Sequence, residues 1–264
     1  MLLRDQLKSI RYIGPLRKIP PRGFEASLSQ KDSAWSDGMA AWETLLTNSH
    51  KLVNDCSEWM ISEGKLNAGY SIRRFQTQEM DLSAPIAQPI GNPKMRLRLV
   101  DQAGLEHQPQ DLGVGISQVL PVVVAAQDAN ASIVCIEQPE LHVHPGVQLG
   151  LGDLFIDGAH KNGLSFLIET HSENLIVRLQ RRIREAKRDS ALEIHYALSP
   201  DDVNIIYLDK NKDGVVQVNK IRLGNDGKFL DRWPNGFFPE RMRETLPKEV
   251  RDRLNAPTEQ KNDL

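Results

Sequence analysis

Apolar positions along the chain follow two different periods. Between residues 33 and 64, tryptophans and leucines recur mainly at spacings of three, four and seven, which predicts helix. In the middle of the chain, two short runs are apolar at almost every position, 132–136 (SIVCI) and 164–168 (LSFLI). Such strands are typical of a parallel sheet, and predicted helices after residues 116 and 145 alternate with them. The pattern predicts an α/β fold in which helices cover both faces of a parallel sheet.

The flanking segments have patterns of their own. Residues 83–93 contain three prolines and predict a loop, whereas 95–100 alternates like a half-buried strand. After residue 200, apolar runs over 203–208 and 215–221 flank a turn. We therefore expect three parts: a helical and loop segment over 1–94, an α/β lobe over 95–200, and a small, β-rich α+β domain over 201–264.

Composition narrows the class of protein. The 264 residues include 33 Lys and Arg against 35 Asp and Glu, a net charge of −2, which gives no support to a strongly basic nucleic-acid coat. The longest apolar run, 119–126, contains Pro121 and is far shorter than the ~20 residues of a membrane helix. With only Cys56 and Cys135, a disulfide framework is excluded, and we expect a cytoplasmic protein.

Two strand ends carry polar chemistry. The first apolar run leads into Glu137 and the second into His171. In a parallel sheet, ligands bind beyond the carboxyl ends of the strands. An acidic residue that closes a buried strand is what nucleotide hydrolases use to hold Mg²⁺, and a histidine on the neighbouring strand can hydrogen-bond a terminal phosphate. The two residues predict a nucleotide site.

Three motifs in order resemble one family. Residues 132–145 (SIVCIEQPELHVHP) resemble the Walker B segment of ABC-type AAA ATPases of the overcoming-lysogenization-defect, RecF and Rad50 kind. Residues 170–172 (THS) resemble the switch-histidine loop of these enzymes, and 111–121 (DLGVGISQVLP) their signature segment. The tail 227–241 and the segment 12–17 resemble a bacterial subgroup with an uncharacterised C-terminal domain. The fold expected is the C-terminal lobe of a P-loop NTPase.

The resemblance implies roles for particular residues with ATP and Mg²⁺ as cofactors. Glu137 would hold Mg²⁺ through water, Gln138 and Glu140 would position the attacking water, and His171 would sense the γ-phosphate. The signature residues would contact a nucleotide bound by an opposing subunit: Gly113, Gly115, Ser117 and Gln118. Gln138 stands where these enzymes usually have a catalytic Glu, and an amide cannot accept the proton of water.

A phosphate-binding loop of the form Gly-x-x-x-x-Gly-Lys-Ser/Thr is missing from the sequence. Gly-Lys occurs at 64–65 and 227–228, but Leu66 and Phe229 follow. We therefore expect the C-terminal portion of an ATPase, which hydrolyses ATP only with a P-loop-bearing lobe or subunit, as a homodimer or with an ATPase partner. The resemblance implies DNA maintenance or phage defence.

The residues also allow other interpretations. The chain could be a non-catalytic fragment that binds a full-length ATPase, or a zinc hydrolase built on Glu140, His142, His144 and His171. Residues 209–214 match half of a calcium-binding loop, although a hairpin turn is the better interpretation. The helix after residue 172 is basic and is either a solvated face or a contact to nucleic acid. Its basic residues are Arg178, Arg181, Arg182, Arg184, Lys187 and Arg188.

Overall fold

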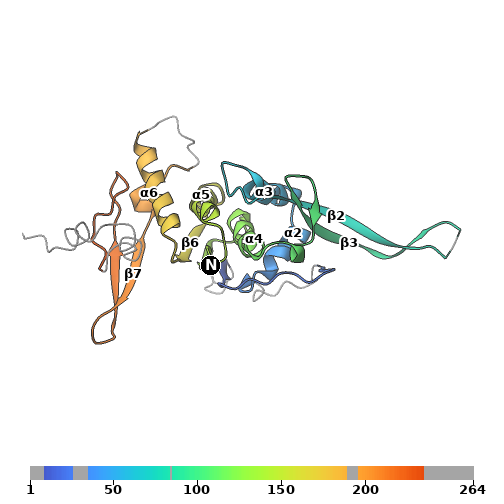
Figure 1. Ribbon diagram of the computed structural model, residues 1–264, viewed down its shortest axis with the longest axis horizontal. Coiled ribbons are helices and arrows are strands. Elements are labelled where there is room, and N and C mark those ends of the chain that lie inside the picture. Colours follow the sequence, from blue (N-terminus) through green and yellow to red (C-terminus); the bar gives the residue numbers. More distant parts are fainter. Residues whose placement is uncertain (1–8, 26–34, 84, 189–195, 235–264) are drawn as a thin grey trace, which may run out of the picture. The chain divides into compact units, whose positions relative to one another are not determined.

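The computed structural model describes residues 9–25, 35–83, 85–188 and 196–234. The chain divides into two compact units, Met1–Leu198 and Ser199–Leu264 (Figure 1). The expected boundary between residues 94 and 95 falls inside a strand of the first unit, and residues 10–13 belong to the central sheet of that unit. The N-terminal segment is therefore part of the α/β unit and not a separate lead into it.

A three-stranded parallel sheet forms the centre of the first unit. Its order is β1 (Ile10–Ile13), β5 (Ile133–Glu137), β6 (Ser165–Glu169). On one face, Ile13, Val134 and Ile136 are buried. On that face α4 (Val114–Gln127) contacts β1 and β5, and α5 (Pro145–Asn162) contacts β6. The α/β class and the parallel sheet with flanking helices are confirmed.

The opposite face of this sheet is exposed. Alternate strand residues share a face, and here those residues are accessible: Tyr12 is 45% exposed and Leu167 is 67% exposed. Ile10 and Ile133 lie beside them at 38% each, and Cys135 is half-buried. The expectation that helices cover both faces is wrong for the described residues, since a continuous apolar run shows that a face suits burial but not what covers it.

The predicted helical stretch 33–64 contains two helices. These are α2 (Met39–Thr47) and α3 (His50–Ile61), and Ser49 separates them because its side chain accepts a hydrogen bond from the Leu52 N–H and begins α3. Trp42 and Trp59 are buried between these helices and the rest of the unit, as core residues.

A long hairpin replaces the predicted loop at residues 83–93. Strand β2 (Tyr70–Asp81) pairs antiparallel with β3 (Gln88–Asp101), and the hairpin projects beyond α3 (Figure 1). The short β4 (Glu106–His107) covers only the end of β3, and the short helix η2 (Pro109–Asp111) follows. Pro89 and Pro93 are tolerated because this part of β3 pairs with β2 alone and so lies in an edge strand, where proline is accepted.

The basic helix α6 (Glu173–Arg188) packs on α5 through a buried carboxylate. Asp153, only 1% exposed, accepts hydrogen bonds from Arg178 Nη1 at 2.7 Å and from Arg182 Nε and Nη2 at 2.7 and 2.8 Å. These bonds raise the pKa of Arg182. Two of the basic residues are therefore structural, and neither is free to contact a phosphate backbone.

The second unit contains the expected hairpin. After η4 (Pro200–Asp202), β7 (Ile205–Lys210) pairs antiparallel with β8 (Val216–Ile221). In the turn, the Asn211 side chain accepts from the Asp213 and Val215 N–H groups, and Gly214 has a φ of 79°. The hairpin interpretation of 209–214 is confirmed. The tail 227–241 resembles the bacterial subgroup, and its residues 235–241 lie outside the described residues.

Candidate functional site

The carboxyl ends of β5 and β6 lie side by side. Glu137 closes β5 and is in direct register with Glu169, which closes β6 two residues before His171. The Tyr12 hydroxyl of β1 donates a 2.7 Å hydrogen bond to Glu137 Oε1, and this bond raises the pKa of Tyr12. The predicted juxtaposition of the two strand ends is confirmed, and the side chains face the exposed side of the sheet.

A tight turn carries the chain from β5 to α5; we refer to residues 137–143 as the strand-end turn. Gln138 has a φ of 44°, in the left-handed region that disfavours non-glycine residues. Its N–H donates to the Glu169 carbonyl at 2.8 Å, and its carbonyl accepts from the Leu141 N–H at 3.1 Å. The first hydrogen bond ties the turn to β6, and the second closes the turn on itself.

Glu140 joins the strand-end turn to residues 170–172, the predicted switch-histidine loop. One carboxylate oxygen accepts from the Thr170 hydroxyl at 2.8 Å, and the other accepts from the His171 N–H at 2.8 Å. The His171 side chain itself is exposed. These two bonds place Glu140 to hold the His171 backbone in position. Each carboxylate oxygen can still accept a second hydrogen bond, so the expected water-positioning role of Glu140 stays a prediction.

The residues predicted to form the signature segment begin α4, with Gly113 as its N-cap. A Cβ on Gly115 would lie 2.6 Å from the His142 carbonyl oxygen, so this glycine is required where α4 meets the strand-end turn. Ser117 is buried and donates to the Val114 carbonyl at 2.8 Å. Gln118 is buried as well. The expectation that Ser117 and Gln118 face an opposing subunit's nucleotide does not match their burial, whereas Gly113 has open space around it.

Arg17 has no predicted role from the sequence motifs, and the structure places it in the middle of this region. Its guanidinium is almost fully buried and donates to the Glu137 carbonyl oxygen at 2.7 Å. A single arginine after Gly-Pro has no spacing pattern that reveals such a contact. Two signals pointed to this segment: residues 12–17 resemble the bacterial subgroup, and Arg17 follows shortly after β1, whose carboxyl end lies at the same edge of the sheet.

The zinc interpretation is not supported. Within residues 9–25, 35–83, 85–188 and 196–234, no three His, Cys, Asp or Glu side chains are grouped as metal ligands. His144 instead caps α5, where its Nδ1 accepts from the Gly146 N–H at 3.1 Å. Glu140 is bound to Thr170 and His171 as described.

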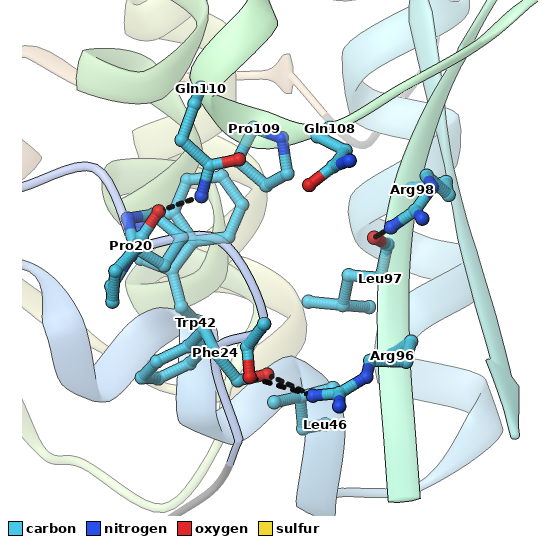
Figure 2. A pocket seen from close by; sticks show the side chains of 12 residues that line it. Pro20, Phe24, Trp42, Leu46, Arg96, Leu97, Arg98, Gln108, Pro109 and Gln110 are labelled. Carbon is cyan, nitrogen blue, oxygen red and sulfur yellow. Dashed lines mark hydrogen bonds between the residues drawn. The ribbon is translucent and has the colours of Figure 1, made fainter. Parts of the chain in front are cut away.

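One pocket lies elsewhere in the first unit, between the segment after β1, α2 and β3 (Figure 2). Trp42 and Phe24 line it together with Gln110, whose Nε2 donates to the Pro20 carbonyl. None of the predicted site residues lines this pocket. The strand ends therefore remain the candidate site.

The chain matches two protein families. Residues 29–178, more than half of the chain, match the family described as "AAA domain, putative AbiEii toxin, Type IV TA system". The chain belongs to this family. It carries an AAA-type, P-loop ATPase-like domain, and the match contains the signature segment, the strand-end turn and His171. Residues 198–246 match a second family, described as a protein of unknown function, DUF3696.

Solved structures with a distant likeness are SMC ATPase heads. The chain is 15% identical to one from work on ATP-driven dimerization and DNA-stimulated activation of SMC ATPases, with coverage of 76% of this chain and 92% of that chain and a TM-score of 0.41. For an Smc head bound to the C-winged helix domain of ScpA, the values are 14%, 66%, 43% and 0.42. For an Smc head with a coiled coil and joint from Pyrococcus yayanosii, they are 14%, 67%, 27% and 0.41. These low scores indicate a distant likeness, from which nothing follows about function.

Two negative findings concern curated relatives and membrane helices. No curated protein matches the chain. Among the described residues, no helix has the length and apolar character needed to span a membrane.

Proposed function

We propose that this chain provides the Walker B, switch-histidine and signature parts of an ABC-type ATPase and that ATP turnover requires a P-loop-bearing lobe or subunit. Membership of the AAA-domain family and the neighbouring ends of β5 and β6 support this proposal. The match over 198–246 is consistent with the bacterial subgroup whose C-terminal domain is uncharacterised. The completed enzyme would act as a head-to-tail pair in DNA maintenance or phage defence.

The exposed face of the central sheet is the observation that carries the proposal. Parallel sheets are covered on both faces, yet here Leu167 and Tyr12 are accessible. Among the described residues, β1 and β6 each pair on one side only. The sequence also lacks a P-loop, since Gly64-Lys65 and Gly227-Lys228 are not followed by Ser or Thr. A lobe that covers this face and supplies the P-loop would complete both the sheet and the site.

The residues at the strand ends fit Mg²⁺ and ATP. A carboxylate such as that of Glu137 is the hard oxygen ligand that Mg²⁺ prefers. When bound, Mg²⁺ would neutralise the negative charge of the phosphates. The exposed His171 imidazole can donate a hydrogen bond to a terminal phosphate. Gln138 can orient water but cannot take its proton. Glu140 holds the His171 backbone.

Cysteine labelling tests the docking of the completing lobe. Cys135 is half-buried on the exposed sheet face, whereas Cys56 is fully buried, and burial raises the pKa of both thiols. We expect a maleimide to label Cys135 in the isolated chain and a P-loop-bearing lobe of the same family to protect it. Cys56 is the internal control, unlabelled in both samples. If the lobe binds and Cys135 stays reactive, the sheet face is not the docking surface.

Nucleotide measurements test the proposed chemistry. Calorimetry with ATP and Mg²⁺ should show only weak binding to the isolated chain, and tight binding would contradict the proposal. In the completed ATPase, Glu137→Gln should abolish hydrolysis, while Glu79→Gln on the projecting hairpin should leave it unchanged. Retained turnover in the Glu137 variant would show that the Mg²⁺ assignment is wrong.

A second function is favoured by one observation. Gln138 stands where ABC-type ATPases usually have the catalytic Glu, and an amide cannot accept the proton of water. The chain would then be a non-catalytic module that binds an ATPase without turnover. Complex formation on size exclusion, with no ATP hydrolysis by the completed assembly, would favour this function over the first.

A further inference from the structure

Arg17 occupies an unusual position for a charged side chain. It is 3% exposed, and its guanidinium reaches two elements that are distant in sequence. Nη2 donates to the Glu137 carbonyl at 2.7 Å and to the Gln138 carbonyl at 3.4 Å, while Nη1 donates to the Gln118 carbonyl at 3.2 Å. The strand-end turn and α4 are therefore bridged by one side chain.

Gln118 holds the backbone of the same residue. Its amide oxygen accepts from the Arg17 N–H at 3.0 Å, and its amide nitrogen donates to the Arg17 carbonyl at 2.6 Å. All of these groups are buried. The pair Arg17–Gln118 thus forms a closed hydrogen-bonding arrangement between the segment after β1 and the first half of α4.

The electrostatics of Arg17 are those of a buried cation. Burial lowers the pKa of Arg17 to about 10, and the negative charge of Glu140 opposes this shift. The guanidinium therefore remains charged at neutral pH. Burying such a charge is costly unless its hydrogen bonds are strong and specific. Here the Arg17 guanidinium donates to carbonyl oxygens of the strand-end turn and of α4. These carbonyl groups are therefore the ones that its positive charge holds in place.

We propose that Arg17 is a positioning residue, which fixes the Glu137–Gln138 peptide to α4 and thereby sets the geometry of the strand-end turn. The inference rests on the proposed function for its catalytic meaning. Gln138 has a left-handed φ of 44°, a conformation that needs support from its surroundings. Arg17 supplies that support through both carbonyl contacts.

The effect of this positioning reaches His171 through Glu140. Glu140 follows the Glu137–Gln138 peptide in the same turn and accepts from the His171 N–H. A displaced peptide moves Glu140 and so releases His171. Arg17 also links the turn to α4, whose N-terminal Gly113 has open space around it. The placement of α4 and the placement of His171 are therefore coupled through Arg17.

Amide hydrogen exchange on the full chain without nucleotide tests the positioning role. The reporters are the Gln138 N–H, bonded to the Glu169 carbonyl, and the His171 N–H, bonded to Glu140. In Arg17→Met both should exchange about tenfold faster or more, because a hydrogen bond to a charged group stabilises local structure by that order. Arg17→Lys, which keeps the charge but not the fork of donors, should give a smaller increase.

Arg74 offers a matched control. Its guanidinium also donates to backbone carbonyls, those of Leu45, Leu46 and Asn48 at the end of α2. Arg74→Met should speed exchange of the Asn48 N–H and leave the Gln138 and His171 reporters unchanged. If both arginine variants speed all reporters alike, or if Arg17→Met and Arg17→Lys leave Gln138 and His171 unchanged, the positioning role is overturned. Should Arg17→Met not fold, Arg17→Lys decides between these outcomes.

Kinetics of the completed ATPase separate this inference from the proposed function. Arg17→Lys should lower kcat about tenfold with little change in KM, since the residue orients the site without touching ATP. A raised KM for ATP with an unchanged kcat would overturn the positioning role. If the exchange rates change as expected but the completed assembly never hydrolyses ATP, the positioning role stands and the proposed function fails.

Discussion

Replacement of Gly115 by alanine tests the contact between α4 and the strand-end turn. The new Cβ would lie 2.6 Å from the His142 carbonyl oxygen, closer than a Cβ approaches backbone in real structures. His142 has a φ of 61°, so its backbone is already constrained and cannot easily move away. Overpacking of this kind costs about 1–3 kcal/mol. Alanine at the second position of α4 gains at most about 1 kcal/mol over glycine.

The steric cost should therefore exceed the gain in helix propensity. We expect Gly115→Ala to lower the free energy of unfolding of the first unit by about 1–2 kcal/mol. Urea denaturation followed by tryptophan fluorescence measures this, in a Trp233→Phe background so that the signal comes from the first unit. Gly64→Ala is the control, because a Cβ there meets nothing within 4 Å. A Gly115→Ala variant as stable as the wild type would refute the packing of α4 on His142.

Two other predictions concern buried and exposed ion pairs. Asp153→Asn should lower the free energy of unfolding by about 3 kcal/mol in the same assay, because it leaves two buried arginines facing a neutral amide. Asp55→Asn is the control and should cost less than about 1 kcal/mol, because the lysine partners of Asp55 are more exposed. Equal effects would show that Asp153 is not the buried anchor of α6. In the second unit, hydrogen bonds from Arg222 lower the pKa of Asp231 to about 2. The contribution of this pair to stability is present above the ordinary carboxyl pKa and is lost as the pH falls towards 2. An NMR titration should therefore show the Asp231 midpoint near 2. Arg222→Gln should raise this midpoint towards about 3.9.

Much of the α/β core could be predicted from local patterns. Continuous apolar runs indicated β5 and β6, and the helical spacing of tryptophans indicated the α2–α3 region. The rule that parallel strands end at one edge placed Glu137 beside the strand that leads to His171. These predictions succeeded because periodicity and strand direction depend on neighbouring residues, whose preferences are written directly in the sequence. The long hairpin was missed because its prolines indicate a loop unless the open edge of a ribbon is known.

The sequence by itself determined which side chains stand at the strand ends, and the tertiary structure decided what each of them can do. Arg17 meets Gln118, 101 positions away, and Glu140 meets His171, 31 positions away. Ser117 is withdrawn into the core, while the apolar face around Leu167 stays exposed. No local period encodes such contacts, because they arise only when the sheet brings distant segments together and the buried polar groups must find partners there.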